Sequence, residues 1–201
     1  MSGITRINIT DTINGSGGWR FRKAKRLHNV ANSLYRDIFE SIGSPLEDGE
    51  EIDNCTLDEF KAGYDYILGI DTILRTKSGQ MLTMQEKFLF THYNTLTVEY
   101  MQNPKSGELG DWYKLKCQVY FVGYDYPYCG NRFVSWILLN WPQVVIATEQ
   151  NKLKWGTQKN TRDGARASFK YVSFSKIPDS CIIARGGMWN IEKLPYETIE
   201  P

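Results

Sequence analysis

Asp71, Gln85 and Lys87 are the three residues whose types and spacing point most directly to chemistry. Gln85 and Lys87 are two positions apart, so in a strand both side chains project from one face and that of Glu86 projects from the other. If Asp71 lies opposite this segment, the Cβ atoms of opposed residues are about 5 Å apart. A carboxylate, an amide oxygen and an ammonium group then meet at one spot, which could hold a divalent cation beside a scissile phosphate.

A hairpin is the element that must bring these residues together. Residues 64–74 are rich in aromatic and β-branched side chains and predict a strand. Lys77-Ser78-Gly79-Gln80 is typical of a turn, because Gly79 can adopt a positive φ. Residues 81–90 predict the returning strand, so an antiparallel pair would place Asp71 opposite the segment 85–87.

This pattern resembles the PD-(D/E)XK nuclease superfamily, whose signature is an Asp ending one strand and Asp/Glu-x-Lys on the next strand of a hairpin. The resemblance covers roughly residues 20–125, and its motif is three residues long. It implies a restriction-endonuclease-like α/β fold, with a mixed central sheet flanked by helices, and Mg²⁺-dependent hydrolysis of DNA (Mn²⁺ is the other candidate ion). It assigns Asp71 and Gln85 to the metal and Lys87 to the phosphate or the attacking water. Gln85 replaces an expected acid, and since an amide brings no charge, the metal affinity should be weaker.

The same family often adds an acid from its first helix. Residues 22–42 predict that helix, because apolar residues recur at spacings of three and four, and Gly43-Ser44-Pro45 ends it. Of the acids near its C-terminal end, Glu40 is preferred over Asp37 as a catalytic and metal-binding residue. A solvated surface Glu40 is an equally weighted alternative.

Length and composition favour one intracellular domain. The 201 residues suffice for a proper core, with residues 1–19 as a flexible lead-in to a domain spanning 20–201. The N-terminus is polar, no apolar stretch is long enough for a membrane span, and a cytoplasmic location is expected. Four scattered cysteines and two histidines give no zinc spacing, and His28 is expected on the helix surface.

Charge distribution suggests where nucleic acid would bind, although the net charge of +1 does not. Basic residues gather at 20–26 and again in the C-terminal third, with an acidic stretch at 47–59 between them. Trp155 lies among lysines in a Gly-containing segment, an arrangement that suits contacts with a nucleic-acid backbone and bases. The predicted nucleic-acid-binding residues are Lys152, Lys154, Trp155 and Lys159. DNA is the expected partner, and a homodimer is a possible assembly.

The remaining pattern predicts strands at 95–101, 115–123, 144–148, 167–174 and 181–184, with 132–141 as helix or strand and a turn at 103–107. Asp111 could lie near the metal, but a helix cap is the favoured role. The aromatic run 120–128 could stack on unpaired bases, but core packing is favoured.

Two rival interpretations remain open. One is a non-catalytic nucleic-acid-binding or assembly module that keeps the fold but has lost metal affinity through Gln85. The other is an unrelated α+β protein in which Asp71 and Lys87 form an ordinary salt bridge across the hairpin.

Overall fold

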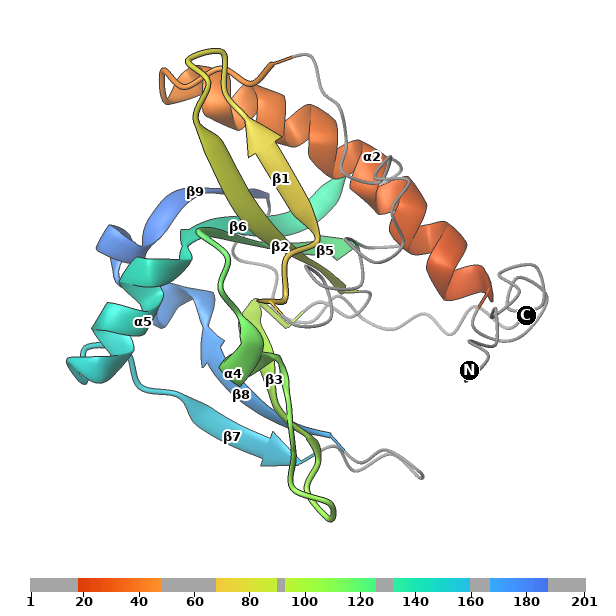
Figure 1. Cartoon of the computed structure of the whole chain (residues 1–201), viewed down its shortest axis with the longest axis vertical. Helices are drawn as coiled ribbons and strands as arrows, with labels where there is room; N and C mark the ends of the chain where they lie inside the picture. The colour runs from red at the N-terminus through yellow and green to blue at the C-terminus, as the bar shows by residue number, and fades with distance from the viewer. Residues whose placement is uncertain (1–17, 48–67, 90–92, 126–131, 160–166, 188–201) are drawn as a thin grey trace, which may run out of the picture.

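The structure of the chain, a computed structural model, describes residues 18–47, 68–89, 93–125, 132–159 and 167–187. Within these ranges the chain has an α/β architecture of two sheets with helices packed against them (Figure 1). No described helix combines the length and the apolar character that a bilayer span requires. The predicted lead-in 1–19 lies almost wholly outside the described residues.

The larger sheet is mixed and has the order β1-β2-β5-β6-β9. β2 and β5 are parallel, whereas all other neighbours are antiparallel. Its strands are β1 (Thr72–Arg75), β2 (Met81–Leu89), β5 (Val119–Asp125), β6 (Phe133–Asn140) and β9 (Ile182–Gly187). The smaller sheet is antiparallel, in the order β4 (Glu108–Leu109), β3 (Thr95–Asn103), β8 (Ser168–Ser173) and β7 (Gly156–Lys159).

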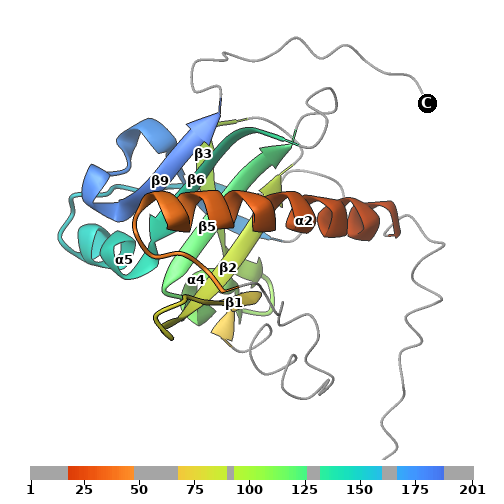
Figure 2. The same ribbon diagram turned by 90° about the horizontal axis from the view of Figure 1, so that it is seen from above.

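Helix α2 (Gly18–Ser41) covers one face of the larger sheet, as Figure 2 shows from above. Its apolar residues share one side, as the spacing predicted, and they form a buried core with Met84, Val119 and Phe121 of the strands. The ring of Tyr35 meets that of Phe121 edge-on at 5.0 Å between centroids. Gly43, with φ of 74°, follows the helix end as predicted.

The other face of the larger sheet packs against α5 (Trp141–Glu149) and the smaller sheet, and this second core contains Tyr120, Val122 and Val98. The short helix α4 (Asp111–Lys114) lies beside β3 (Figure 1). Two 3₁₀ turns, η3 (Phe174–Lys176) and η4 (Asp179–Cys181), connect β8 to β9. Because side chains alternate along a strand, those of β2 face α2 on one side of the sheet, and α5 and the smaller sheet on the other.

Several predicted elements are confirmed: the helix, the hairpin turn at Gly79, the turn at 103–107, and the strands at 81–90 (as far as Leu89, the last described residue there), 95–101, 167–174 and 181–184. The segment 132–141 is a strand, β6, over most of its length. The strand predicted at 115–123 begins at Val119 instead.

Two predictions were wrong. Residues 144–148 are part of α5 rather than a strand, because Asn140 caps a helix there through a bond from the Gln143 amide to Asn140 Oδ1 of 3.2 Å. Of the strand predicted at 64–74, the described residues 68–74 are extended only from Thr72, where β1 begins, since Gly69 has a φ of 58° and interrupts extended backbone.

Candidate functional site

Asp71 lies opposite the segment 85–87 across the hairpin, as predicted, and it contacts Gln85. The register pairs Thr72 with Met84, and the Asp71 amide donates to the Met84 carbonyl at 2.9 Å, so Asp71 lies opposite Gln85. Gln85 Nε2 donates to Asp71 Oδ2 at 2.5 Å. The backbone amide of Glu86 donates to the same oxygen at 2.8 Å. The Asp71 carboxylate is thereby held over β2 immediately before β1 begins.

Gly69 makes room for the Gln85 side chain. A Cβ at Gly69 would lie 3.2 Å from Gln85 Oε1 and 3.1 Å from Leu115 Cδ2, tighter than most real Cβ contacts. The positive φ at Gly69 turns the chain past the amide before it reaches Asp71. The irregular segment ahead of β1 therefore passes close to the Gln85 oxygen at Gly69.

Lys87 projects from the same face but reaches toward the smaller sheet. Its Nζ lies 5.9 Å from the centroid of the Phe169 ring, and Phe169 pairs with Glu99 between β8 and β3. Burial lowers the pKa of the Lys87 ammonium, while the charges of Asp111 and Glu99 oppose that decrease. Within the described residues Lys87 forms no ion pair with Asp71, so the salt-bridged hairpin is not observed.

Helix α4 is pressed against β3 at Gly110. The Gly110 amide donates to the Tyr100 carbonyl at 3.0 Å, and a Cβ at Gly110 would lie only 2.6 Å from the Glu99 carbonyl oxygen. Gly110 is the N-cap residue, so the predicted capping role of Asp111 was wrong. Burial, and then the charge of Asp111, raise the pKa of Glu99. The charges of Asp111 and Glu99 thus act on each other and on Lys87.

Tyr120 lies below this face of the hairpin. It pairs with Gln85 between β2 and β5, is buried, and stacks on Trp141 at 5.0 Å between centroids. Burial raises its pKa well above the usual value, with further contributions led by Asp111 and including Asp71. The neighbouring Cys117 is a buried free thiol whose pKa burial raises to about 12. Tyr120 and Cys117, the residues below this face of the hairpin, are therefore uncharged at neutral pH.

Glu86 projects from the opposite face, as predicted, into the interface with α2. Its carboxylate accepts a bond from the Tyr35 hydroxyl at Oε1, of 2.6 Å. Its Oε2 lies 2.7 Å from His28 Nδ1 and 3.2 Å from Thr72 Oγ1. The side chain of Glu86 is only 6% exposed and that of His28 16%, so the expectation of a surface histidine was wrong.

Glu40 does not join Asp71 and Gln85. It is exposed on α2, and α2 packs against the face of the sheet that Glu86 presents, not the face of Gln85 and Lys87. The family-based assignment of an acid from the first helix therefore fails for Glu40.

The Trp155 segment, residues 152–159, follows α5. Trp155 is half-buried, its Nε1 donates to Thr148 Oγ1 at 2.9 Å, and its ring meets that of Trp112 edge-on at 5.0 Å. The indole therefore packs in the molecule, whereas the three predicted cations around it are exposed: Lys152, Lys154 and Lys159. The described rings of the aromatic run 120–128 are buried, and this confirms core packing for them.

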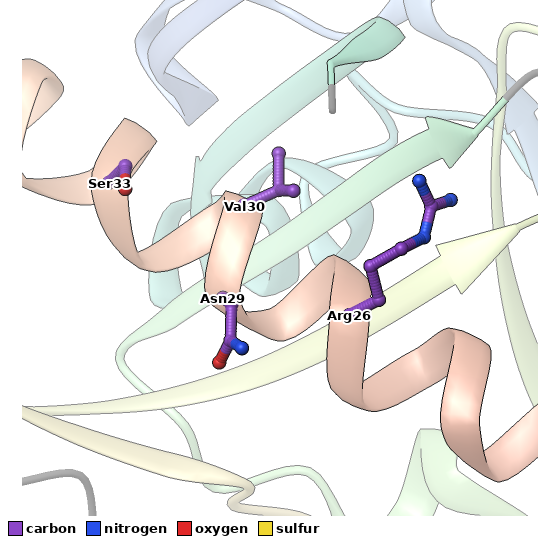
Figure 3. A pocket seen from close by; sticks show the side chains of 4 residues that line it. All are labelled: Arg26, Asn29, Val30 and Ser33. Atoms are coloured by element: carbon purple, nitrogen blue, oxygen red, sulfur yellow. The ribbon is translucent and has the colours of Figure 1, made fainter. Parts of the chain in front are cut away.

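A surface hollow of about 350 Å³ lies along α2, lined by Arg26, Asn29, Val30 and Ser33 (Figure 3). These residues recur at spacings of three and four and so form one stripe of the helix. Arg26 is already committed to an ion pair of 3.0 Å with the buried Asp125. The hollow lies on the helix rather than beside the Gln85 and Lys87 side chains.

The oxygen donors on the hairpin suit a hard cation in type, since carboxylate and amide oxygens both bind Mg²⁺. Their number is small: no cluster of three or more His, Cys, Asp or Glu side chains suited to a metal occurs in the described part of the chain. Among the three motif residues Asp71, Gln85 and Lys87, Asp71 alone carries a carboxylate.

Sequence reasoning missed Glu86, Tyr35, His28 and Glu99. A weak signal existed, because His28 and Tyr35 are seven residues apart and therefore share one side of a helix. Comparisons with family models, with curated proteins and with solved structures returned no match for this chain.

Proposed function

We propose that this chain is a Mg²⁺-dependent deoxyribonuclease with a restriction-endonuclease-like fold. The observation that carries the proposal is the contact of Asp71 with Gln85 across the hairpin, with Lys87 on the same face two residues farther along β2. The mixed sheet and the helix that precedes the hairpin support the fold assignment. DNA is the proposed substrate because this arrangement resembles that of PD-(D/E)XK nucleases.

Asp71 and Gln85 would hold the ion, which supplies an acidified water and stabilises negative charge on phosphate. Gln85 would be the neutral ligand, with its amide rotated so that Oε1 takes the place of Nε2 beside Asp71, and Asp71 would be the charged one. Lys87 contributes a cation whose burial strengthens its attraction for a phosphate oxygen. Asp111 and Glu99 favour the protonated form of Lys87, which is the form that this role requires.

A second candidate function is a nucleic-acid-binding module without catalysis. It is favoured by the orientation of Gln85, whose nitrogen rather than its oxygen contacts Asp71. An amide and a carboxylate that satisfy each other need no metal ion between them.

The test is DNA cleavage with and without Mg²⁺ by the wild type and by Asp71→Ala, with folding followed by circular dichroism. We expect metal-dependent cleavage that Asp71→Ala abolishes while the fold persists. Asp179→Ala is the matched control, because that side chain is 92% exposed and remote in the fold, on η4. DNA binding by the wild type without cleavage and without heat of Mg²⁺ binding would favour the second candidate.

A further inference from the structure

The buried carboxylate of Glu86 lies within hydrogen-bonding distance of donor groups on two elements, α2 and β1. Tyr35 and His28 reach it from α2, and Thr72 reaches it from β1. Because a carboxylate accepts hydrogen bonds only, the Tyr35 hydroxyl, the Thr72 hydroxyl and His28 Nδ1 act as donors. A buried charge with several donors resists displacement, since any movement would break bonds that water cannot replace.

The backbone of Glu86 carries this restraint to the other face of the sheet. The Glu86 N–H donates a hydrogen bond to Asp71 Oδ2 at 2.8 Å. In addition, Thr72, the residue after Asp71, donates a hydrogen bond to the Glu86 side chain. Asp71 itself precedes the first residue of β1, an edge strand. The orientation of the Asp71 carboxylate therefore depends on the position of the Glu86 backbone in β2.

We propose that Tyr35 and His28 are positioning residues for Asp71, acting through Glu86. Helix α2 sets the direction of the Asp71 carboxylate although it covers the opposite face of the sheet. This inference rests on the proposed function in one respect, namely that Asp71 is the metal ligand. Partners that orient metal ligands typically contribute about 10- to 100-fold to metal affinity.

Tyr35→Phe is the most direct test, because it removes one hydroxyl and keeps the buried ring. Tyr124→Phe is its matched control: Tyr124 is fully buried and donates an equally short bond of 2.6 Å to the Thr95 carbonyl. The first readout is the backbone amide of Glu86 in ¹H–¹⁵N spectra. We expect a shifted resonance and faster hydrogen exchange at Glu86 in Tyr35→Phe, and neither change in Tyr124→Phe.

The second readout is Mg²⁺ affinity by titration calorimetry. Tyr35→Phe should bind Mg²⁺ about 10-fold more weakly than the wild type, and Tyr124→Phe should match the wild type. An unchanged Glu86 amide together with unchanged affinity in Tyr35→Phe would overturn the positioning role. A shifted amide in a protein whose wild type binds no Mg²⁺ would support the positioning of Asp71 and refute the metal site instead.

A pair of His28 variants keeps the test decisive if Tyr35→Phe does not fold. His28→Leu removes the donor, whereas His28→Asn retains an N–H donor near the position of Nδ1. We expect the Glu86 amide to shift in His28→Leu and to return toward its wild-type position in His28→Asn. Equal spectra for both variants at Glu86 would refute the role.

Discussion

At Gln85 the motif carries an amide where a second carboxylate would be expected, and the neighbouring contacts show how the chain accommodates it. Gln85 donates to Asp71 through Nε2, and its oxygen occupies the space that Gly69 leaves open. A glutamate at the same position would repel Asp71 unless a cation lay between them. Replacement of Gln85 with an acid therefore distinguishes a metal site from a purely structural contact.

Replacing Gln85 with Glu should raise Mg²⁺ affinity about 30-fold or more, because one added negative charge about 4 Å from a doubly charged ion contributes about 2 kcal/mol even in water. Without metal, Gln85→Glu should be less stable than the wild type, and Mg²⁺ should restore its stability. Titration calorimetry and thermal unfolding check both effects. Gln158→Glu, at an exposed site on the edge strand β7, makes the same charge change elsewhere and should alter neither. Absence of Mg²⁺ and Mn²⁺ binding in both the wild type and Gln85→Glu would refute the metal site.

Lys87 should affect turnover more than metal binding, because an ammonium group is not a metal ligand. Removal of one preorganised electrostatic contact commonly lowers the rate about 100-fold or more. We therefore expect Lys87→Ala to lose most cleavage activity while its Mg²⁺ affinity stays close to that of the wild type. Lys170→Ala is a suitable control, since Lys170 also lies over an aromatic ring, 3.9 Å from the centroid of Trp112. Normal cleavage by Lys87→Ala would remove the lysine from the site.

Among the elements, α4 depends on an unusually close approach to β3. Gly110 has φ of −89° and ψ of −173°, which any residue can adopt, so only the contact with the Glu99 backbone demands glycine. Gly110→Ala should therefore destabilise the protein by about 1–3 kcal/mol through overpacking. Urea unfolding measures the change. Leu109→Ala, at a neighbouring residue that is 47% exposed, should have little effect, and equal stability of Gly110→Ala and the wild type would contradict the close contact.

An element can be predicted from the sequence where local residue preferences determine it, but not where packing against distant elements does. The approximate hairpin register came from local turn chemistry, and it correctly placed Asp71 opposite the segment 85–87. Helix α5 was missed because its run of β-branched residues predicts a strand, although Asn140 and Pro142 are helix-start signals that could have corrected the error. The Glu86 network could not be predicted, since it requires the packing of α2 on β2.

At the scale of the whole molecule, the candidate site lies where the two sheets meet. Lys87 of the larger sheet reaches Phe169 of the smaller one, and α4 brings Asp111 to the same junction. The smaller sheet ends at β7, which lies within the Trp155 segment and includes Lys159. An extended substrate that reaches the junction could therefore contact both the hairpin and the exposed lysines near β7.

The last prediction concerns that longer surface. Replacement of the three exposed lysines around Trp155 should weaken DNA binding and make the binding constant less dependent on salt. The slope should fall by about 0.9 for each lysine–phosphate interaction that the substitutions remove. The measurement is DNA affinity at several salt concentrations for the triple variant Lys152→Ala, Lys154→Ala and Lys159→Ala.

A control with the same change in net charge replaces three other exposed lysines: Lys77, Lys105 and Lys176. If the two triple variants decrease in affinity and slope equally, net charge alone explains the effect. If only the first variant does so, the Trp155 segment binds the phosphate backbone. An unchanged slope in both would locate the phosphate-binding residues elsewhere, with the basic cluster at residues 20–26 as the next candidate.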